Sequence, residues 1–280
     1  MQTLLTIAGI GAGLYLVLAV SIYAFQRSLI FYPDATYSTP AESGLSGVNE
    51  VKLTTPDGET LIAWYAEADP GQPTILYFHG NAGNLVNRAP RIERFARAGY
   101  GTFMLAYRGY GGSTGKPSES AIVADAALAY DHLRGLGVPS RDILAYGESL
   151  GSGVAVQLAA THEVGALILD APYTSLPAIG KRLYPFLPVE TFMTDRFDSE
   201  RHIAKVRAPI LILHGTNDGV IPVELGRELF ETAHEPKVMA ELEGAGHSDI
   251  YMFDALEHLE RFIAQHRENA DRREPAEASQ

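Results

Sequence analysis

The chain contains no cysteine among its 280 residues. This absence excludes disulfide bonds, catalysis by a thiolate and metal sites built on cysteine, although it leaves the redox compartment open. Basic residues are also in deficit, because 22 Lys and Arg face 34 Asp and Glu and the formal net charge is -12. Since phosphate binding needs a basic surface, this balance argues against nucleic acid as a partner. Repeats and low-complexity segments are absent too, and 46% hydrophobic residues favour one globular domain with additional segments.

Charged residues are missing from the segment between Thr3 and Phe25, and Arg27 closes this apolar run. As a helix the run would be about 34 Å long, and the hydrocarbon core of a bilayer is about 30 Å thick. We therefore predict a single-pass, N-terminal transmembrane anchor over residues 1–28. Arg27 weakly favours a cytoplasmic location for the rest of the chain, but one charge does not decide the orientation.

A cleaved signal peptide is the main alternative for this segment, because Ala19-Val20-Ser21 offers small residues at plausible cleavage positions. However, no Lys or Arg precedes the run, and the run is longer than a typical signal-peptide core of about 7 to 15 residues. A buried core helix is a further alternative.

After a connector at 29–47, short Val-, Ile- and Leu-rich segments alternate with amphipathic ones over residues 48–267. The pattern predicts an α/β fold with a mainly parallel, twisted sheet and helices on both faces, opened by a hairpin. Ligands bind at the carboxyl ends of the strands in such sheets, so functional residues are expected just after strands. The predicted strands are 51–53, 60–66, 74–78, 101–106, 142–146, 166–169, 210–213 and 237–242, and the predicted helices are 85–98, 118–136, 149–161 and 249–266.

The alternation breaks in one segment, 173–206, which mixes apolar residues with several prolines. We expect this insertion to form a small cap above the strand ends. An irregular surface connection that carries one sheet-covering helix is the alternative. The tail at 268–280 is charged and lacks apolar periodicity, which predicts disorder.

A serine lies where a strand must turn sharply into a helix, in Gly147-Glu148-Ser149-Leu150-Gly151. This arrangement is typical of a nucleophile elbow, in which small neighbours allow close backbone packing and the serine adopts strained dihedral angles. A second match to the pattern surrounds Ser113, but there no helix begins at the serine. We therefore predict Ser149 as the nucleophile.

A serine hydroxyl needs an imidazole to take its proton and a carboxylate to orient that imidazole. His247 lies in a Gly-rich loop between the last predicted strand and the last helix, which favours it as the base. His214 directly follows a strand and is expected to be packed or bonded to backbone. Asp218 lies in a loop after a strand and is the predicted acid, with Asp170, at the end of another strand, as the alternative.

Acyl transfer also needs hydrogen-bond donors for the developing oxyanion. The backbone N–H of Leu150 is one expected donor, and Asn81, in a loop after a strand, is the other, with Ala82 as the alternative. His79 is expected to stabilise that loop through a backbone hydrogen bond. Glu148 is expected to point away from the base, in a structural or substrate-rim role.

These motifs resemble those of the α/β-hydrolases, and specifically of the membrane-anchored Bem46 and ABHD13/17-like branch. The order Ser, Asp, His agrees with that fold. The resemblance implies a Ser149, Asp218 and His247 triad, oxyanion donors at Asn81 and Leu150, and chemistry without a metal or an organic cofactor. The branch includes mammalian protein depalmitoylases, whose N-terminal cysteine cluster this chain lacks. The motifs that carry the resemblance are the apolar N-terminus, Phe78-His79-Gly80-Asn81-Ala82-Gly83, Tyr107-Arg108-Gly109-Tyr110-Gly111, the elbow, Phe197-Asp198-Ser199, His214-Gly215-Thr216-Asn217-Asp218 and Gly246-His247.

The sequence therefore predicts a serine hydrolase that cleaves carboxylic esters or thioesters through an acyl-enzyme. Its expected partners are a small-molecule or lipid-like acyl ester as substrate and the membrane, which the N-terminal helix contacts. A serine peptidase of the same fold and a non-catalytic binding protein of that fold are the alternatives. A peptidase would normally carry extra elements that grip a peptide.

Overall fold

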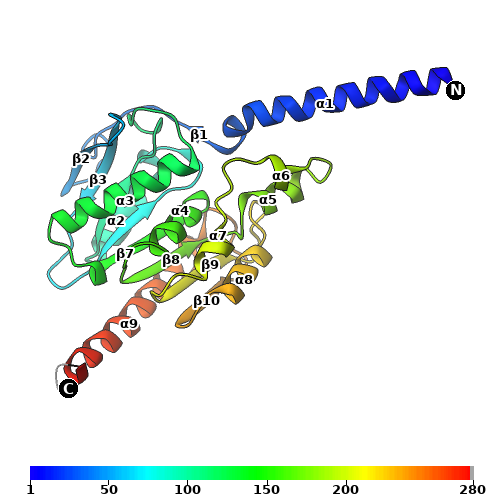
Figure 1. The fold of residues 1–280 in the computed structure, drawn as a ribbon. Coiled ribbons are helices and arrows are strands. Elements are labelled where there is room, and N and C mark those ends of the chain that lie inside the picture. The colour runs from blue at the N-terminus through cyan, green and yellow to red at the C-terminus, as the bar shows by residue number, and fades with distance from the viewer. Residues whose placement is uncertain (278–280) are drawn as a thin grey trace.

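One mixed sheet organises the chain. The computed structural model describes residues 1–277, with side chains as far as Arg267. Within that part, eight strands pair in the order β10-β9-β8-β7-β4-β6-β3-β2 (Figure 1). Neighbouring strands run parallel from β10 to β6. The strand β3 is antiparallel to both of its neighbours, β6 and β2. The prediction of a mainly parallel sheet is confirmed. The strands are β2 Val48–Thr54, β3 Thr60–Ala66, β4 Thr74–Phe78, β6 Gly101–Leu105, β7 Ile143–Glu148, β8 Ala166–Asp170, β9 Ile210–Gly215 and β10 Lys237–Leu242.

Helices cover both faces of the sheet, as expected. Every residue of β4, β6, β8 and β9 is buried, because neither face of these central strands meets water. On one face, α3, α4, α7 and α8 contact one another in series. On the other, Phe95 of α2 contacts the rings of Tyr77 and Tyr146 in the sheet and of Tyr251, just before α9. The helices are α2 Ala89–Arg97, α3 Glu119–Gly135, α4 Leu150–Ala159, α7 Ser199–Ile203, α8 Val223–Thr232 and α9 Ala255–Glu277.

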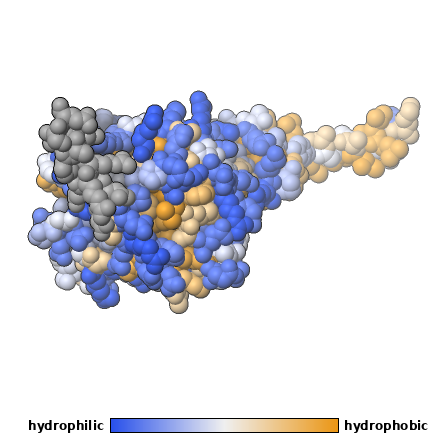
Figure 2. Space-filling model, turned by 90° about the horizontal axis from the view of Figure 1, so that it is seen from below, coloured by the Kyte–Doolittle hydropathy of each residue, from blue (hydrophilic) through white to orange (hydrophobic). Residues whose placement is uncertain are grey.

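A long N-terminal helix, α1 Gln2–Ile30, protrudes from this body (Figure 1). It is long and apolar enough to cross a membrane. Figure 2 shows it as an apolar rod that leaves a body rich in hydrophilic side chains. Just after α1, the two-residue strand β1 Tyr32–Pro33 pairs in parallel with β5 Ala82–Gly83. The end of α1 is therefore attached to the loop that follows β4.

The segment between β8 and β9 contains three short helices. Two of them, α5 Leu176–Leu183 and α6 Val189–Phe192, lie beside the C-terminal half of α1 (Figure 1). The third, α7, contacts α4 and α8 and belongs to the layer on the sheet. The segment 173–206 thus combines the cap and the sheet-covering helix that the sequence offers as alternatives. We use "cap" below for residues 175–193.

The helix boundaries differ from the sequence prediction in three places. The segment 85–98 begins with a 3-10 turn, Val86–Arg88, and a second turn, Ile250–Met252, precedes α9. The helix α9 continues to Glu277, into the segment 268–280 for which the sequence predicts disorder, because Ala, Glu and Arg favour helix. Residues 278–280 lie outside the described residues.

The helix α8 was not predicted, and Gly226 in its middle explains the omission. Glycine disfavours helix by about 1 kcal/mol relative to alanine. Here it is required, because a Cβ at this position would overlap the ring of His214. Tertiary packing therefore overrides local propensity in α8.

Close backbone packing holds α4 against the sheet. A Cβ at Gly151 would collide with the carbonyl oxygen of Phe78 in β4, and one at Gly147 would collide with that of Gly151. Between them, Ser149 has φ 50° and ψ -118°, and its N–H donates to the carbonyl of Asp170 at 2.8 Å. These are the strained serine and the small neighbours that a nucleophile elbow requires.

We expect Gly151→Ala to lower the free energy of unfolding by at least about 2 kcal/mol, because the methyl group forces α4 away from β4. Urea unfolding of the detergent-solubilised protein measures the change. Gly135→Ala at the end of α3 is the matched control, since nothing lies within 4 Å of its added Cβ. The control should raise stability slightly or leave it unchanged. Equal stability of the two variants would contradict the role given to this contact.

Candidate active site

Three loops at the carboxyl ends of strands bring the predicted nucleophile, base and acid together. Ser149 follows β7, Asp218 follows β9 and His247 follows β10. The Oγ of Ser149 lies 3.0 Å from Nε2 of His247, and Nδ1 of His247 lies 2.7 Å from Oδ2 of Asp218. Both distances are within hydrogen-bonding range, so a proton has a direct path from the hydroxyl to the imidazole.

The carboxylate of Asp218 is fixed from several sides. Its Oδ1 accepts the backbone N–H groups of Val220 and Ile221, both at 2.8 Å. Burial alone would raise the pKa of Asp218, but hydrogen bonds from His214, His247 and this backbone outweigh burial and hold it well below its usual range. Asp218 is therefore ionised and is a fixed acceptor for the imidazole.

The hydrogen bond between Asp218 and His247 also changes the pKa of the imidazole. Burial lowers the pKa of His247, but the hydrogen bond to Asp218 and the negative charges of Asp218, Asp170 and Glu148 outweigh it. The net pKa is raised above the ordinary value. The protonated imidazole, which forms when the serine attacks, is thereby stabilised.

The alternative acid, Asp170, faces away from the base. Its Oδ2 accepts hydrogen bonds from Nη1 of Arg91 at 2.7 Å and from the hydroxyl of Tyr146 at 3.1 Å. Sequence reasoning did not identify Arg91, which lies in α2. Its guanidinium forms ion pairs with Asp170 and Glu148 beside the elbow. The described contacts thus place Asp218, and not Asp170, against His247.

Glu148 also points away from the base, as expected. It accepts hydrogen bonds from the Tyr77 hydroxyl at 2.6 Å and from Nη2 of Arg88 at 3.1 Å. Burial would raise the pKa of Glu148, but the charges of Arg91 and Arg88 lower it to about 2. Glu148 therefore has a structural role: it pairs with Arg88 beside the elbow, where Arg91 pairs with Asp170. Burial raises the pKa of Asp170, and the charge of Arg91 opposes this effect.

The remaining candidates from the sequence have structural roles. Ser113 accepts the N–H of Ile62 at 2.8 Å and donates to the carbonyl of Ala106 at 2.9 Å, so its hydroxyl braces the loop after β6. His79 is bonded to the carbonyl of Gly80 at 2.7 Å, and burial lowers its pKa to about 3. His214 likewise bonds to a backbone carbonyl, that of Ile221.

The loop that carries Asn81 is tied to the end of α1. The side-chain amide of Asn81 donates to the carbonyl of Ile30 at 3.1 Å, and the carbonyl of Asn81 accepts the Tyr110 hydroxyl at 2.7 Å and the N–H of Tyr32 at 2.9 Å. Because the side-chain amide is engaged, we expect Asn81 to offer its backbone N–H, and not its side chain, to an oxyanion. The backbone N–H of Leu150, at the first turn of α4, is the other expected donor.

A cavity of about 440 Å³ lies in front of Ser149 and is lined by Asn81 and Leu150 as well. Its volume lies in the range of about 300 to 1,000 Å³ that is usual for small-molecule sites. None of the described residues that line it carries a formal charge. The other lining residues come from α1, the cap, β1 and the loops after β8 and β9: Ile22, Gln26, Leu29, Ile30, Tyr32, Tyr173, Leu176, Ile179, Gly180, Leu183, Tyr184, Val189, Met193, Gly219, Val220 and Ile221.

Among the described residues, no group of three or more His, Asp or Glu side chains is arranged to hold a metal ion. The imidazole of His247 contacts the hydroxyl of Ser149, and Asn81 and Leu150 line the same cavity. This arrangement is suited to acyl transfer from a substrate carbonyl to the serine.

Comparisons with known proteins agree with the motifs. A family model described as serine aminopeptidase, S33, matches residues 69–197. An uncharacterized protein of Mycobacterium tuberculosis is 37% identical over 250 residues, 87% of this chain and 89% of that protein. Alpha/beta hydrolase domain-containing protein 17B of Homo sapiens is 35% identical and covers 75% of this chain and 73% of its own length. Protein bem46 of Schizosaccharomyces pombe is 33% identical, with 72% of each chain covered. The resemblance drawn from the motifs is confirmed.

The fold is shared with solved esterases. The structure of the Pyrococcus furiosus esterase Pf2001 matches with a TM-score of 0.67 and 20% identity, over 84% of this chain and 97% of that one. This likeness shows the fold.

We expect activity to rise with pH through the pKa of His247, because the neutral imidazole is the base. The midpoint should lie above the ordinary value of about 6.5, because the pKa of His247 is raised. Asp218→Asn removes the charge that raises it and should move the midpoint to lower pH, with a loss in turnover of about 10⁴-fold. Ester hydrolysis measured from pH 5 to 9 checks both. An unchanged profile in Asp218→Asn would exclude Asp218 as the orienting acid.

Proposed function

The chain belongs to the α/β-hydrolase family, and we propose that it is a serine hydrolase that cleaves carboxylic esters or thioesters through an acyl-enzyme. The observation that carries the proposal is the hydrogen-bonded series Ser149, His247 and Asp218 at the end of an uncharged cavity. Each group has the partner that its role needs.

In the first step, Oγ of Ser149 attacks the substrate carbonyl carbon while Nε2 of His247 takes the hydroxyl proton. The tetrahedral intermediate collapses, His247 returns that proton to the leaving alcohol or thiol, and the acyl group stays on Ser149. Water then attacks the ester, with His247 again as base, and releases the acid. Asp218 stays ionised throughout, which agrees with its lowered pKa.

The oxyanion of each intermediate is stabilised by the backbone N–H groups of Leu150 and Asn81. Removing one such donor in a serine hydrolase typically costs about 10² to 10³ in turnover. Because these donors belong to the backbone, their positions depend on the elbow and on the loop after β4.

An aminopeptidase is the second candidate, because the matching family model carries that description. Such an enzyme must bind the ammonium group of a peptide N-terminus. The described residues that line the cavity include no carboxylate, so the ammonium would lose water without gaining a counter-charge. The apolar walls favour an acyl chain.

The membrane anchor is also part of the proposal. The helix α1 has the length and the apolar surface of a membrane span, and Arg27 pairs with Asp195 at the base of the helix. A fixed ion pair at that point would hold the hydrolase domain at the membrane surface.

A fluorophosphonate probe should label the wild-type protein and fail to label Ser149→Ala, because the probe reacts with an activated serine. Ser113→Ala is the matched control from the second motif and should remain labelled. Esters and peptides of similar size, offered to wild-type protein that has not been treated with the probe, separate the two candidate activities. Equal labelling of wild type and Ser149→Ala would refute the assignment of the nucleophile.

We expect the mature protein to retain residues 1–28 and to stay in the membrane fraction after washing with high salt, because burial of an apolar span does not depend on charge. Intact-mass measurement of protein purified from membranes checks this. A mass that lacks the first ~21 residues would establish a cleaved signal peptide instead.

A further inference from the structure

One polar contact sets the depth of the cap relative to the membrane. The hydroxyl of Tyr15 in α1 donates to the backbone carbonyl of Phe186, between α5 and α6, at 2.9 Å. A hydrocarbon core takes up about 20 helical residues. Every stretch of 20 residues within Gln2–Ile30 contains Tyr15. If α1 crosses a bilayer, Tyr15 therefore lies within the hydrocarbon core, and the backbone at Phe186, which Tyr15 contacts, lies there too.

The tip of the cap is built for apolar surroundings. Its side chains at Leu183, Phe186 and Phe192 are 63%, 60% and 55% exposed. The stretch 183–189 carries no charge, and Lys181 and Arg182 precede it. Lys181 pairs with Glu190 at 3.1 Å and Arg182 lies 4.0 Å from Glu228, so both basic residues face carboxylates that lie outside the apolar stretch. Backbone at membrane depth must have its polar groups satisfied, and the Tyr15 hydroxyl does this for the Phe186 carbonyl.

One face of α1 turns toward the cap. The residues of α1 that are not fully exposed are Ala19, Ile22, Gln26 and Ile30, which recur at helical spacing. Gln26 fixes the position of α1 along the cap. Its side-chain oxygen accepts hydrogen bonds from both the N–H and the hydroxyl of Thr194, which directly follows the cap, at 2.8 and 3.0 Å. The helix is therefore docked on the cap by specific polar contacts.

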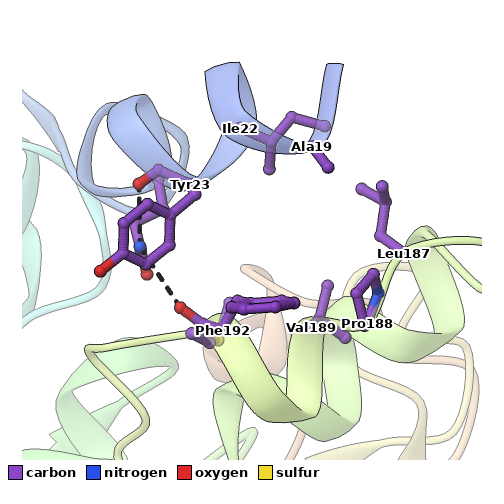
Figure 3. Close-up of a pocket in the computed structure, with 9 residues that line it drawn as sticks. Ala19, Ile22, Tyr23, Leu187, Pro188, Val189 and Phe192 are labelled. Carbon is purple, nitrogen blue, oxygen red and sulfur yellow. Dashed lines mark hydrogen bonds between the residues drawn. The ribbon is translucent and has the colours of Figure 1, made fainter. Parts of the chain in front are cut away.

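Between α1 and the cap runs an apolar groove. Figure 3 shows Ala19 and Ile22 of α1 facing Leu187, Pro188 and Val189 of the cap. Four side chains line both this groove and the cavity at Ser149: Ile22, Gln26, Val189 and Met193. The groove and the catalytic cavity thus share a wall.

We infer that the cap enters the bilayer beside α1 and that the acyl chain of a membrane-resident ester reaches Ser149 through the groove between them. This inference rests on the proposed hydrolase function and on the proposed anchor. The α1 side chains are then specificity-determining residues, and the ester group lies at Ser149 with its chain directed along Ile22 toward the lipid.

The absence of cysteine makes the depth of the cap directly measurable. Phe186→Cys is labelled with an environment-sensitive fluorophore and placed in lipid nanodiscs. Lipids that carry a nitroxide on the acyl chain should quench the fluorescence of this label roughly twofold, because the label lies within the hydrocarbon. Leu136→Cys is the control, since that residue is also exposed but ends α3, away from the cap. Quenching at 186 no stronger than at 136 would overturn the inference.

The groove is tested by blocking it in the full-length protein. Ile22→Trp should lower the turnover of a palmitate ester relative to a butyrate ester at least about tenfold, because each methylene excluded from an apolar site costs roughly fourfold in binding. Val20→Trp places the same bulk on the exposed face of α1 and should leave the palmitate to butyrate ratio at the wild-type value.

These outcomes separate the two proposals. Suppose that the fluorophosphonate labels Ser149 and that the butyrate ester is hydrolysed, but that Ile22→Trp and Val20→Trp have the same ratio of palmitate to butyrate turnover. The proposed hydrolase function is then supported, and the proposed route of the acyl chain is wrong. If Ser149 is not labelled, the proposed function itself fails, whatever the depth of the cap.

Discussion

The backbone contact between α4 and β4 is the constraint on which the catalytic arrangement depends. It requires glycine at 151, and the equally close contact of β7 with α4 requires glycine at 147. Between these two glycines Ser149 adopts the strained dihedral angles that lift it out of the sheet. Because Ser149 belongs to the turn that this contact creates, its 3.0 Å approach to His247 follows from packing more than from local preference. The N–H of Leu150 is positioned by the same turn, so the proposed nucleophile and one proposed oxyanion donor depend on the same backbone contacts.

The second donor depends on a different part of the chain. The side-chain amide of Asn81 donates a hydrogen bond to the carbonyl of Ile30. The backbone carbonyl of Asn81 accepts hydrogen bonds from the Tyr110 hydroxyl and from the N–H of Tyr32. The end of α1 and the loop after β6 thus brace the loop after β4 from two sides. The end of the N-terminal helix is for this reason tied to the loop that carries Asn81, the second proposed oxyanion donor.

The sequence predicted the sheet and the three loops that meet at the site, because a parallel sheet places every post-strand loop at one edge. That position narrowed the candidates for nucleophile, base and acid, and the elbow motif, the Gly-rich loop of His247 and the family resemblance selected Ser149, His247 and Asp218 among them. The helix α8 was missed because Gly226 obeys a contact with His214 that no local pattern reveals. Arg91 was missed for a similar reason, since its partner Asp170 lies 79 residues away. The docking of α1 on the cap likewise depends on pairs such as Gln26 and Thr194 that are distant in sequence.

The distribution of charge around Ser149 gives the site a direction. Glu148 and Asp170 lie on the sheet side of the elbow, where they pair with Arg88 and Arg91. The opposite side consists of α1 and the cap, whose lining residues carry no charge. A substrate with one polar and one apolar end therefore has a single favourable orientation, because a reversed ester would place its chain against buried ions and its polar head among aliphatic side chains.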